Sequence, residues 1–370
     1  EGRAVQASLR PNPELSVDLE NAWGDYPGTS RAETTYGISQ LVETGKRSTR
    51  IRRAEAEKGV LRRDLEVARF DVAADVKRAF IRFLSGWKKL ELHREAHGIA
   101  TLLAAAVSDR VAAGAVSPIE ETRARVALAV SSADVERTGM EVESARRDLS
   151  AAMGEAAPSF DIPSGDLDED LSAPAVDNIA ERIAATPDVA RWAAETERRN
   201  AALDEERKLA IPDVTLKGGI KRLRESSENT FVLGLSVPLP LFHRNQGAIR
   251  EAEAQRAKAD VERRSTERLL RSQAGQRLAA FSAAAREAAL LRKEALPGAQ
   301  SAHDAVSEGY RLGKFRYLDV LDTGRSLVET RLRYLDTLTA LNLARADLER
   351  LTAVSPPVGE RTTAIQGASR

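Results

Sequence analysis

Two aspartates, Asp319 and Asp322, follow a glycine break at Gly313 and lie three residues apart. Residues with this spacing project from nearly one face of a helix. Carboxylates attract and select cations when they surround a narrow opening. A structural role also fits, because acidic residues in the first turn of a helix interact favourably with its N-terminal dipole.

Glu120 is a second candidate, and it closes a capping box that starts at Ser117 and has Pro118 at the first helical position. Capping alone explains this glutamate. Gly114 and Gly313 each precede such a helix start. Because glycine readily ends a helix in the left-handed conformation, both positions predict a sharp helical reversal.

His93 and His97 are spaced i, i+4, a geometry that can chelate a divalent metal. Their segment is not the zinc-protease motif, because its glutamate stands one place too late, and a solvated helix face explains the pair as well. Residues 309–314 resemble a phosphate-binding loop superficially. Phe315 replaces the required Ser or Thr, and the spacing is one residue short, so that motif is excluded. No convergent His, Cys or Ser constellation supports an enzyme, and no cofactor is expected.

The composition excludes several classes of protein. The 370 residues include no Cys, 2 Met, and 56 basic against 56 acidic residues. The lack of Cys excludes disulfide scaffolds and thiol catalysis, and the two Met make a soft-ligand copper relay a poor fit. A zero net charge with both signs interspersed argues against nucleic-acid binding. Only 4% of residues are aromatic, which favours long packed helices over a thick globular core.

The sequence shows neither a membrane-spanning helix nor a secretory signal. No run approaches the ~18 apolar residues that a spanning helix needs. The residues from Glu1 onward do not form a charged region followed by an apolar one. If the protein is exported, we therefore expect a start that has been processed or truncated.

The chain reads as a tandem repeat. Residues 12–17 resemble residues 211–216, and Gly313 repeats Gly114 at the same offset of 199 residues. Several matches in one order and nearly one register indicate a duplication. The predicted repeats are residues 1–185 and 186–370.

Each repeat predicts two strands, a very long helix, a glycine break and a return helix. The first long helix, Arg47–Ala113, has no proline and could reach roughly 100 Å. Its counterpart, Gly247–Leu312, carries Pro297 and should kink there. Residues 156–174 predict a surface linker between the repeats. Apolar stripes with coiled-coil-like spacing line the return helices: Val142, Ala145, Leu149 and Ala152, then Leu321, Val328, Leu332 and Leu335.

The predicted strands alternate apolar and polar residues, most regularly over Phe231–Leu239. Alternating segments of about ten residues are typical of a membrane β-barrel, although two surface hairpins beside a helical bundle fit the pattern equally well. Four strands cannot close a barrel, and open edges are not tolerated in lipid, so a barrel would need several copies of the chain. Trp23 and Tyr26, near the first hairpin, fit either an interfacial aromatic girdle or packing at a loop tip.

Together these features resemble the TolC-like outer-membrane efflux protein family, in its heavy-metal (CzcC-like) branch. The resemblance covers essentially the whole chain. One departure is the single Gly45 where a Gly-Gly pair is usual. The segments that carry the resemblance are residues 12–15, 43–47, 211–214, 238–247 and 310–322, of which the last two are the most specific.

The resemblance implies an α+β membrane protein that forms a homotrimer. Its twelve-stranded β-barrel would lie in the outer membrane of a Gram-negative bacterium, and its long helices would form an α-helical barrel in the periplasm. A periplasmic adaptor would dock it onto an inner-membrane proton-driven pump. The family's first helix and any lipidated cysteine would lie upstream of Glu1. The expected regions are residues 12–44 and 210–245 for the barrel hairpins, 45–153 and 246–353 for the long helices, 154–209 for linker and equatorial helices, and 354–370 for the tail.

The resemblance also assigns roles at the helix reversals. Asp319 and Asp322 would form acidic rings at the periplasmic entrance. Glu120 would accept a hydrogen bond from Tyr310 of the neighbouring tip, which would latch the helix pairs shut. Arg316 would be the cationic partner, although the family's usual arginine position is Phe315 here. Adaptor hairpins would dock on the tips at residues 111–119 and 312–318, which include Gly114, Ser117, Pro118 and Gly313.

These inferences converge on a passive trimeric exit duct of a tripartite efflux system for heavy-metal cations, without catalysis. An organic-solute duct of the same family remains an alternative. So does a soluble coiled-coil scaffold, which would suit the helices but would not need the alternating strands.

Overall fold

The computed structural model describes residues 1–22, 28–168 and 178–352. They form two compact units. The first comprises Glu1–Val67 and Pro187–Glu267, and the second comprises the described parts of Ala68–Thr186 and Arg268–Arg370. Trp23 and Tyr26, the end of the acidic run (residues 169 and 170), and the tail 354–370 lie outside the described residues.

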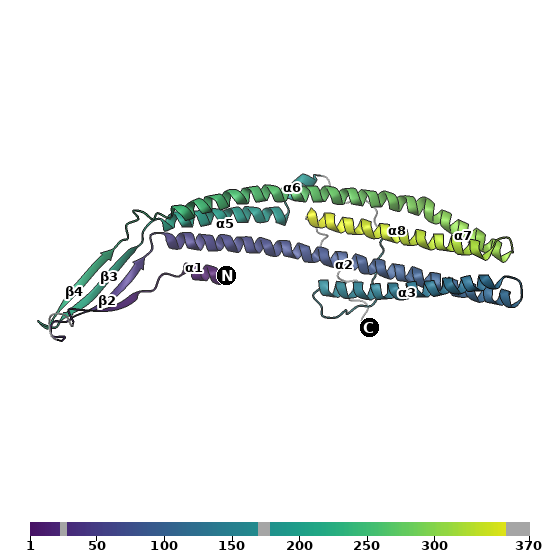
Figure 1. Ribbon diagram of the computed structural model, residues 1–370. Coiled ribbons are helices and arrows are strands. Elements are labelled where there is room, and N and C mark those ends of the chain that lie inside the picture. The colour runs from purple at the N-terminus through teal and green to yellow at the C-terminus, as the bar shows by residue number, and fades with distance from the viewer. Residues whose placement is uncertain (23–27, 169–177, 353–370) are drawn as a thin grey trace. The chain divides into compact units, whose positions relative to one another are not determined.

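The first unit contains one antiparallel sheet in the order β1-β2-β3-β4 (Figure 1). The register pairs Gly37 with Gly219 at the contact between the two hairpins. The outer strands, β1 and β4, each pair with a single neighbour. The strands are β1 Glu14–Glu20, β2 Glu33–Val42, β3 Val214–Leu223 and β4 Glu228–Ser236.

The two faces of the sheet differ in polarity. Pairing of Leu15 with Ile38, and of Leu216 with Leu235, puts one apolar set on one face. On that face Phe231 is 88% exposed and Leu233 is 87% exposed, so the single chain covers little of it. The apolar face consists of Leu15, Val17, Leu19, Tyr36, Ile38, Leu216, Ile220, Phe231, Leu233 and Leu235.

The opposite face is polar. It carries Asp18, Glu20 and Lys221, and the Lys221 ammonium lies 2.7 Å from a Glu20 carboxylate oxygen. Lys221 also contacts Glu33 of β2. A polar face opposite an unburied apolar one is the pattern of strands that face lipid on one side.

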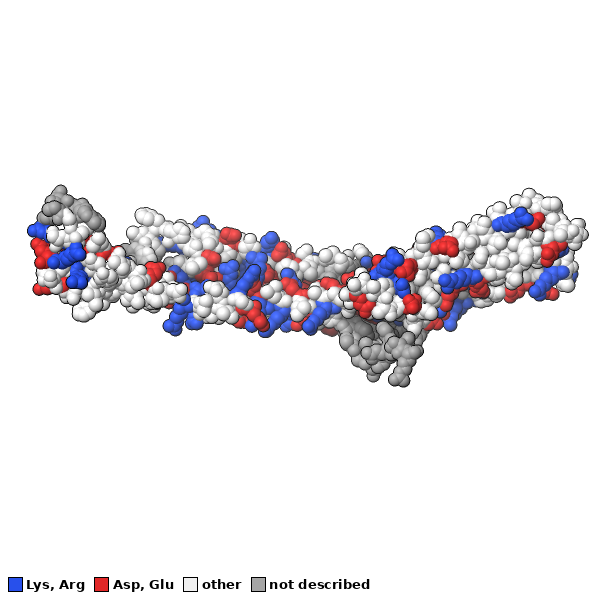
Figure 2. Space-filling view, turned by 90° about the horizontal axis from the view of Figure 1, so that it is seen from below, with Lys and Arg blue, Asp and Glu red and all other residues white. Residues whose placement is uncertain are grey.

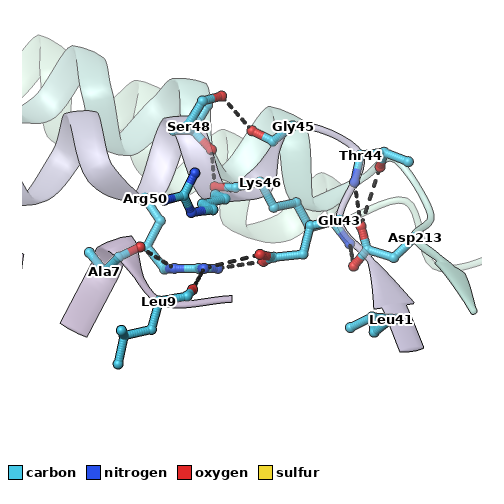
Figure 3. Close-up of polar contacts among 12 residues, drawn as sticks. Ala7, Leu9, Leu41, Glu43, Thr44, Gly45, Lys46, Ser48, Arg50 and Asp213 are labelled. Carbon is cyan, nitrogen blue, oxygen red and sulfur yellow. Dashed lines mark hydrogen bonds and ion pairs between the residues drawn. The ribbon is translucent and has the colours of Figure 1, made fainter. Parts of the chain in front are cut away.

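Charged ties join the sheet to the helices of the first unit (Figure 3). The Arg50 guanidinium donates to Glu43 at 2.6 Å and to the carbonyl oxygen of Leu9 at 3.1 Å. Asp213 accepts from the Thr44 amide at 3.0 Å and from the Lys46 ammonium at 2.9 Å. These contacts fix where the strands end. The helices of the first unit are α1 Gly2–Ser8, α5 Pro187–Leu209, and the first parts of α2 Lys46–Ala112 and α6 Gln246–Leu290.

The two long helices differ as their proline content predicts. The 67 residues of α2 run without a break. In the second repeat, α6 ends at Leu290 and a π-helical turn, η1 Leu291–Ala295, leads into α7 Leu296–Arg311. The irregular turn directly precedes Pro297, which cannot donate a helical hydrogen bond and crowds the preceding turn.

The return helices bury different proportions of the predicted stripes. These helices are α3 Pro118–Ala152 and α8 Tyr317–Leu351, and a short α4 Ile179–Ala184 lies in the same unit. On α3, Val142 and Leu149 are buried against Phe83 as predicted. On α8 the four predicted residues are only half-buried, and Leu321 packs against a buried cluster. The helix more fully buries Val320, Leu327, Leu338, Leu341 and Leu348.

The linker is not purely a surface segment, which corrects the prediction. Leu167 is only 4% exposed and packs among Ile81 of α2, Ala288 of α6 and Leu338 of α8. Its neighbour Asp168 accepts a hydrogen bond from the Tyr334 hydroxyl at 2.8 Å. The acidic composition of the segment concealed one apolar residue that three helices enclose.

Leu167→Ala should lower the free energy of unfolding of the second unit by about 2–5 kcal/mol, because it leaves a cavity among packed helices. Ile162→Ala, in the same linker, is the matched control, since Ile162 is 66% exposed. Denaturant unfolding followed by helical circular dichroism measures both. Equal, small effects would contradict the observed burial of Leu167.

Charge is distributed without a basic patch on the face that Figure 2 shows, where acidic and basic side chains alternate. Among the helices that the structure describes, none combines the length and apolar character needed to cross a bilayer.

Candidate functional site

The two helix reversals share one backbone geometry. Gly114 has φ +70° and Gly313 has φ +74°. At the first, the amide of Ala115 donates to the Arg110 carbonyl at 2.8 Å, and the same bond, from Lys314 to Gly309, recurs 199 residues later at 2.8 Å. This is the Schellman arrangement, which needs a residue in the left-handed region.

The helix starts after these turns are capped differently. At α3, the Ser117 hydroxyl accepts from the Ile119 amide at 3.4 Å. The capping box predicted with Glu120 is wrong: Glu120 Oε2 is buried, and the structure gives it no hydrogen-bond partner. At α8, Asp319 Oδ2 accepts from the backbone amide of Arg316 at 2.9 Å, so an aspartate performs the capping there.

An aromatic cluster packs the two reversals together within the second unit. Tyr310 is 8% exposed and Tyr317 is 2% exposed, with ring centroids 6.2 Å apart. The cluster also includes Val107, Ala124 and Val320. The Tyr310 hydroxyl, like Glu120 Oε2, is buried without a partner among the described residues. A buried polar atom that lacks a partner costs about 1–3 kcal/mol.

The cation beside Tyr310 is Arg110, whose guanidinium carbon lies 4.8 Å from the ring centroid. Arg316 lies 3.7 Å from Asp319, with 78% of its side chain exposed. Among the described residues of the single chain, no hydrogen bond or ion pair joins Arg316 to Tyr310 or Glu120, so its place in the latch stays a prediction. Sequence reasoning missed Arg110. A basic residue in the last turn of α2 was the available signal, since such residues favour the C-terminal dipole.

Phe315 also has a packing role at the tip. A methyl group added to Gly309 would overlap the Phe315 ring. The aromatic residue that stands at the family's arginine position therefore lies against the helix that precedes the turn. It contributes packing where the family pattern would contribute charge.

Asp319 and Asp322 differ in how far their carboxylates are exposed and engaged in contacts. One oxygen of Asp319 is engaged in capping, and the side chain is 35% exposed. Asp322 is exposed, and no hydrogen bond or ion pair joins it to another described residue. Asp322 therefore presents its whole carboxylate to solvent, whereas the Asp319 carboxylate is only partly exposed.

Burial, together with the nearby Tyr310 and Glu120, raises the pKa of Tyr317 to about 12. The folded tip thus favours the neutral phenol. Because the pKa is 10.0 without these effects, this contribution to stability is complete below pH 10 and is lost as the pH rises toward 12.

Phenolate absorbance should therefore show two late ionisations, since burial and Asp168 also raise the pKa of Tyr334 to about 12. Tyr317→Phe should remove one of them. Tyr334→Phe is the control that removes the other. If the Tyr317→Phe titration matched that of the unchanged protein, Tyr317 would not be buried at the tip.

His93 and His97 do not converge on a metal site. His93 is 8% exposed, and the Nδ1 atom of His97 lies 3.0 Å from the Ser131 hydroxyl. Among the described residues, no group of three or more potential ligands could hold a metal ion. Packing and hydrogen bonding account for both histidines.

Comparison with known proteins decides the family. The model of the outer membrane efflux protein family matches residues 2–155 and 178–354. The chain belongs to this family. Its members are efflux channels of the outer membrane rather than enzymes, so the chain is an outer-membrane protein.

Two curated relatives in this family are metal-resistance proteins. The cobalt-zinc-cadmium resistance protein CzcC of Cupriavidus metallidurans is 36% identical over 355 residues, which cover 95% of this chain and 83% of that protein. The nickel-cobalt-cadmium resistance protein NccC of Alcaligenes xylosoxydans xylosoxydans is 27% identical over 268 residues, covering 72% of this chain and 60% of that protein.

Solved structures of other membrane proteins share the fold. A membrane protein from Pseudomonas aeruginosa superposes with a TM-score of 0.80 at 20% identity, over 94% of this chain and 85% of that one. The outer membrane protein VceC of Vibrio cholerae gives 0.78 at 18% identity, over 95% of this chain and 89% of that one. The predicted family and its mixed helix-and-sheet fold are therefore confirmed.

Proposed function

We propose that the chain forms the passive, trimeric exit duct of a tripartite efflux system that exports heavy-metal cations. The observation that carries the proposal is the four-stranded sheet. Its apolar face is exposed, with Leu233 at 87%, and strands β1 and β4 each lack a second neighbour. An outer-membrane protein cannot leave such edges open in lipid.

Pairing β4 of one copy with β1 of the next satisfies both edges. Three copies give a closed barrel of twelve strands, with the apolar face toward lipid and Asp18, Glu20 and Lys221 toward the lumen. The helices of the three copies would then form a tube in the periplasm. The exposed apolar residues Val126 and Val130 of α3 and Leu61 of α2 are available for contacts between copies.

Heavy-metal cations are the proposed substrate because CzcC, at 36% identity, is a cobalt, zinc and cadmium resistance protein. Within a trimer, Asp322 and the partly exposed carboxylate of Asp319 would form acidic rings at the entrance and attract cations. A wide duct would select among ions only by the sign of their charge. Energy would come from an inner-membrane proton-driven pump, through a periplasmic adaptor that docks on residues 111–119 and 312–318.

Tyr310 and Glu120 are the proposed latch of the entrance. Each has a buried polar atom without a hydrogen-bond partner among the described residues of the single chain, and both raise the pKa of the Tyr317 phenol. A hydrogen bond from the Tyr310 hydroxyl to the Glu120 carboxylate in the closed trimer would give both buried atoms a partner. Arg110, stacked on Tyr310, is the better-placed cationic partner.

Tyr310→Phe should therefore raise the open probability of single channels in a planar bilayer, because a hydrogen bond to a charged acceptor contributes about 1.5–3 kcal/mol. Tyr334→Phe removes a hydroxyl elsewhere in the same unit and is the control. Unaltered gating in Tyr310→Phe would leave Glu120 without a latch role.

Deletion of the gene in its own host tests the substrate. We expect reduced tolerance of cobalt, zinc or cadmium with unchanged tolerance of organic toxicants. The reverse result would favour the organic-solute duct of the same family. Unchanged tolerance of both, with a purified protein that needs no detergent, would favour the coiled-coil scaffold.

A further inference from the structure

The apolar pattern of β4 continues beyond the end of the sheet. Strand β4 ends at Ser236, yet apolar residues keep their alternate spacing at positions 237, 239 and 241, and Phe242 follows. We define residues 237–242 as the junction loop. Its apolar side chains are exposed: Val237 by 40%, Leu239 by 75%, Leu241 by 64% and Phe242 by 90%.

The backbone of the junction loop is nevertheless held in place. Arg244 Nε donates to the Pro240 carbonyl at 3.2 Å, and the side-chain Nε2 of Gln246 donates to the Phe242 carbonyl at 3.3 Å. Asn245 anchors the end of the loop by donating to the Glu206 carbonyl of α5 at 2.9 Å. The loop therefore presents its apolar side chains from a fixed backbone.

The register places this loop at the edge of the apolar face. Thr215 pairs with Ser236, so the register, if continued, would set Val237 opposite Val214. The next residue of β3's chain is Asp213, which belongs to the charged ties of Figure 3. The apolar face thus gives way to charge at this level, which is where headgroups meet acyl chains when such a face lies in lipid.

We propose that the junction loop binds the polar–apolar interface of the phospholipid bilayer and anchors the sheet's periplasmic edge there. The proposal rests on the proposed lipid-facing sheet, because the loop continues its apolar face. Basic Arg244 and His243, both exposed, follow directly and suit the phosphate level of the interface. The two prolines, Pro238 and Pro240, lack amide donors, so this stretch cannot extend a ladder with another strand.

The absence of Cys from the sequence allows single labelling sites. We would attach a nitroxide to Phe242→Cys and to Leu239→Cys, reconstitute each in phosphatidylethanolamine–phosphatidylglycerol vesicles, and compare collision with oxygen and with a water-soluble nickel chelate. Phe231→Cys reports the apolar face of β4, and Asp18→Cys reports the polar face of β1.

The proposal predicts high oxygen and low nickel accessibility at Leu239 and Phe242, as at Phe231. High nickel accessibility at the loop, with Phe231 in lipid, would overturn it and show a water-exposed loop. Low accessibility to both reagents, with an immobilised spectrum, would overturn it in favour of contact between copies. If Phe231 itself reported water, the lipid-facing sheet would fail and the loop proposal with it.

Discussion

Replacing both Asp319 and Asp322 by Asn should cause a severalfold fall in the cation-to-anion permeability ratio of the reconstituted channel. In a trimer the change removes six carboxylates from the proposed entrance, and such rings set charge selectivity. Reversal potentials across a salt gradient in a planar bilayer measure the ratio.

The two aspartates should not contribute equally. Asp322 has no engaged oxygen, so Asp322→Asn alone should account for most of the loss. Asp319→Asn should also weaken the start of α8, because Asp319 Oδ2 accepts from the Arg316 amide. Asp304→Asn, at an exposed position on α7, is the control. An unchanged permeability ratio in the double variant would reject the acidic rings.

Leu233→Arg should prevent assembly in vesicles, whereas Val232→Arg should be tolerated. These neighbours lie on opposite faces of β4, with Leu233 on the apolar face and Val232 on the polar one. An arginine that faces lipid costs about 2–4 kcal/mol at mid-bilayer, and a trimer would incur that cost in each copy. An arginine in the lumen stays hydrated.

Electrophoretic mobility of unheated samples would follow assembly of both variants as a slowly migrating oligomer. Equal assembly of the two variants would mean that the two faces of the sheet meet the same environment. That result would contradict a lipid-facing sheet and favour a soluble protein.

Features that depend on local periodicity could be predicted from the sequence. Alternation at Leu15 and Phe231 predicts strands because side chains alternate across a sheet. Gly114 and Gly313 predict the reversals because few other residues adopt a positive φ. The absence of proline from α2 and the presence of Pro297 in the second repeat predict where each long helix is regular.

Features that depend on tertiary packing could not be predicted in this way. The linker composition does not reveal that Leu167 fills a space among three helices. The buried face of α8 is set by several neighbouring helices, so a single heptad pattern identified half-buried positions and not the most buried ones. At the tip, the motif around Ser117 predicts a capping box, but packing directs Glu120 into the aromatic cluster and brings Arg110 onto Tyr310.

The mass of the purified protein, measured by light scattering with and without detergent, tests the central claim most directly. A shared barrel predicts a particle of three chains, each of 40.2 kDa, that stays in solution only when detergent covers the apolar face. A monomer or dimer that is soluble without detergent would contradict the shared barrel and, with it, the exit duct.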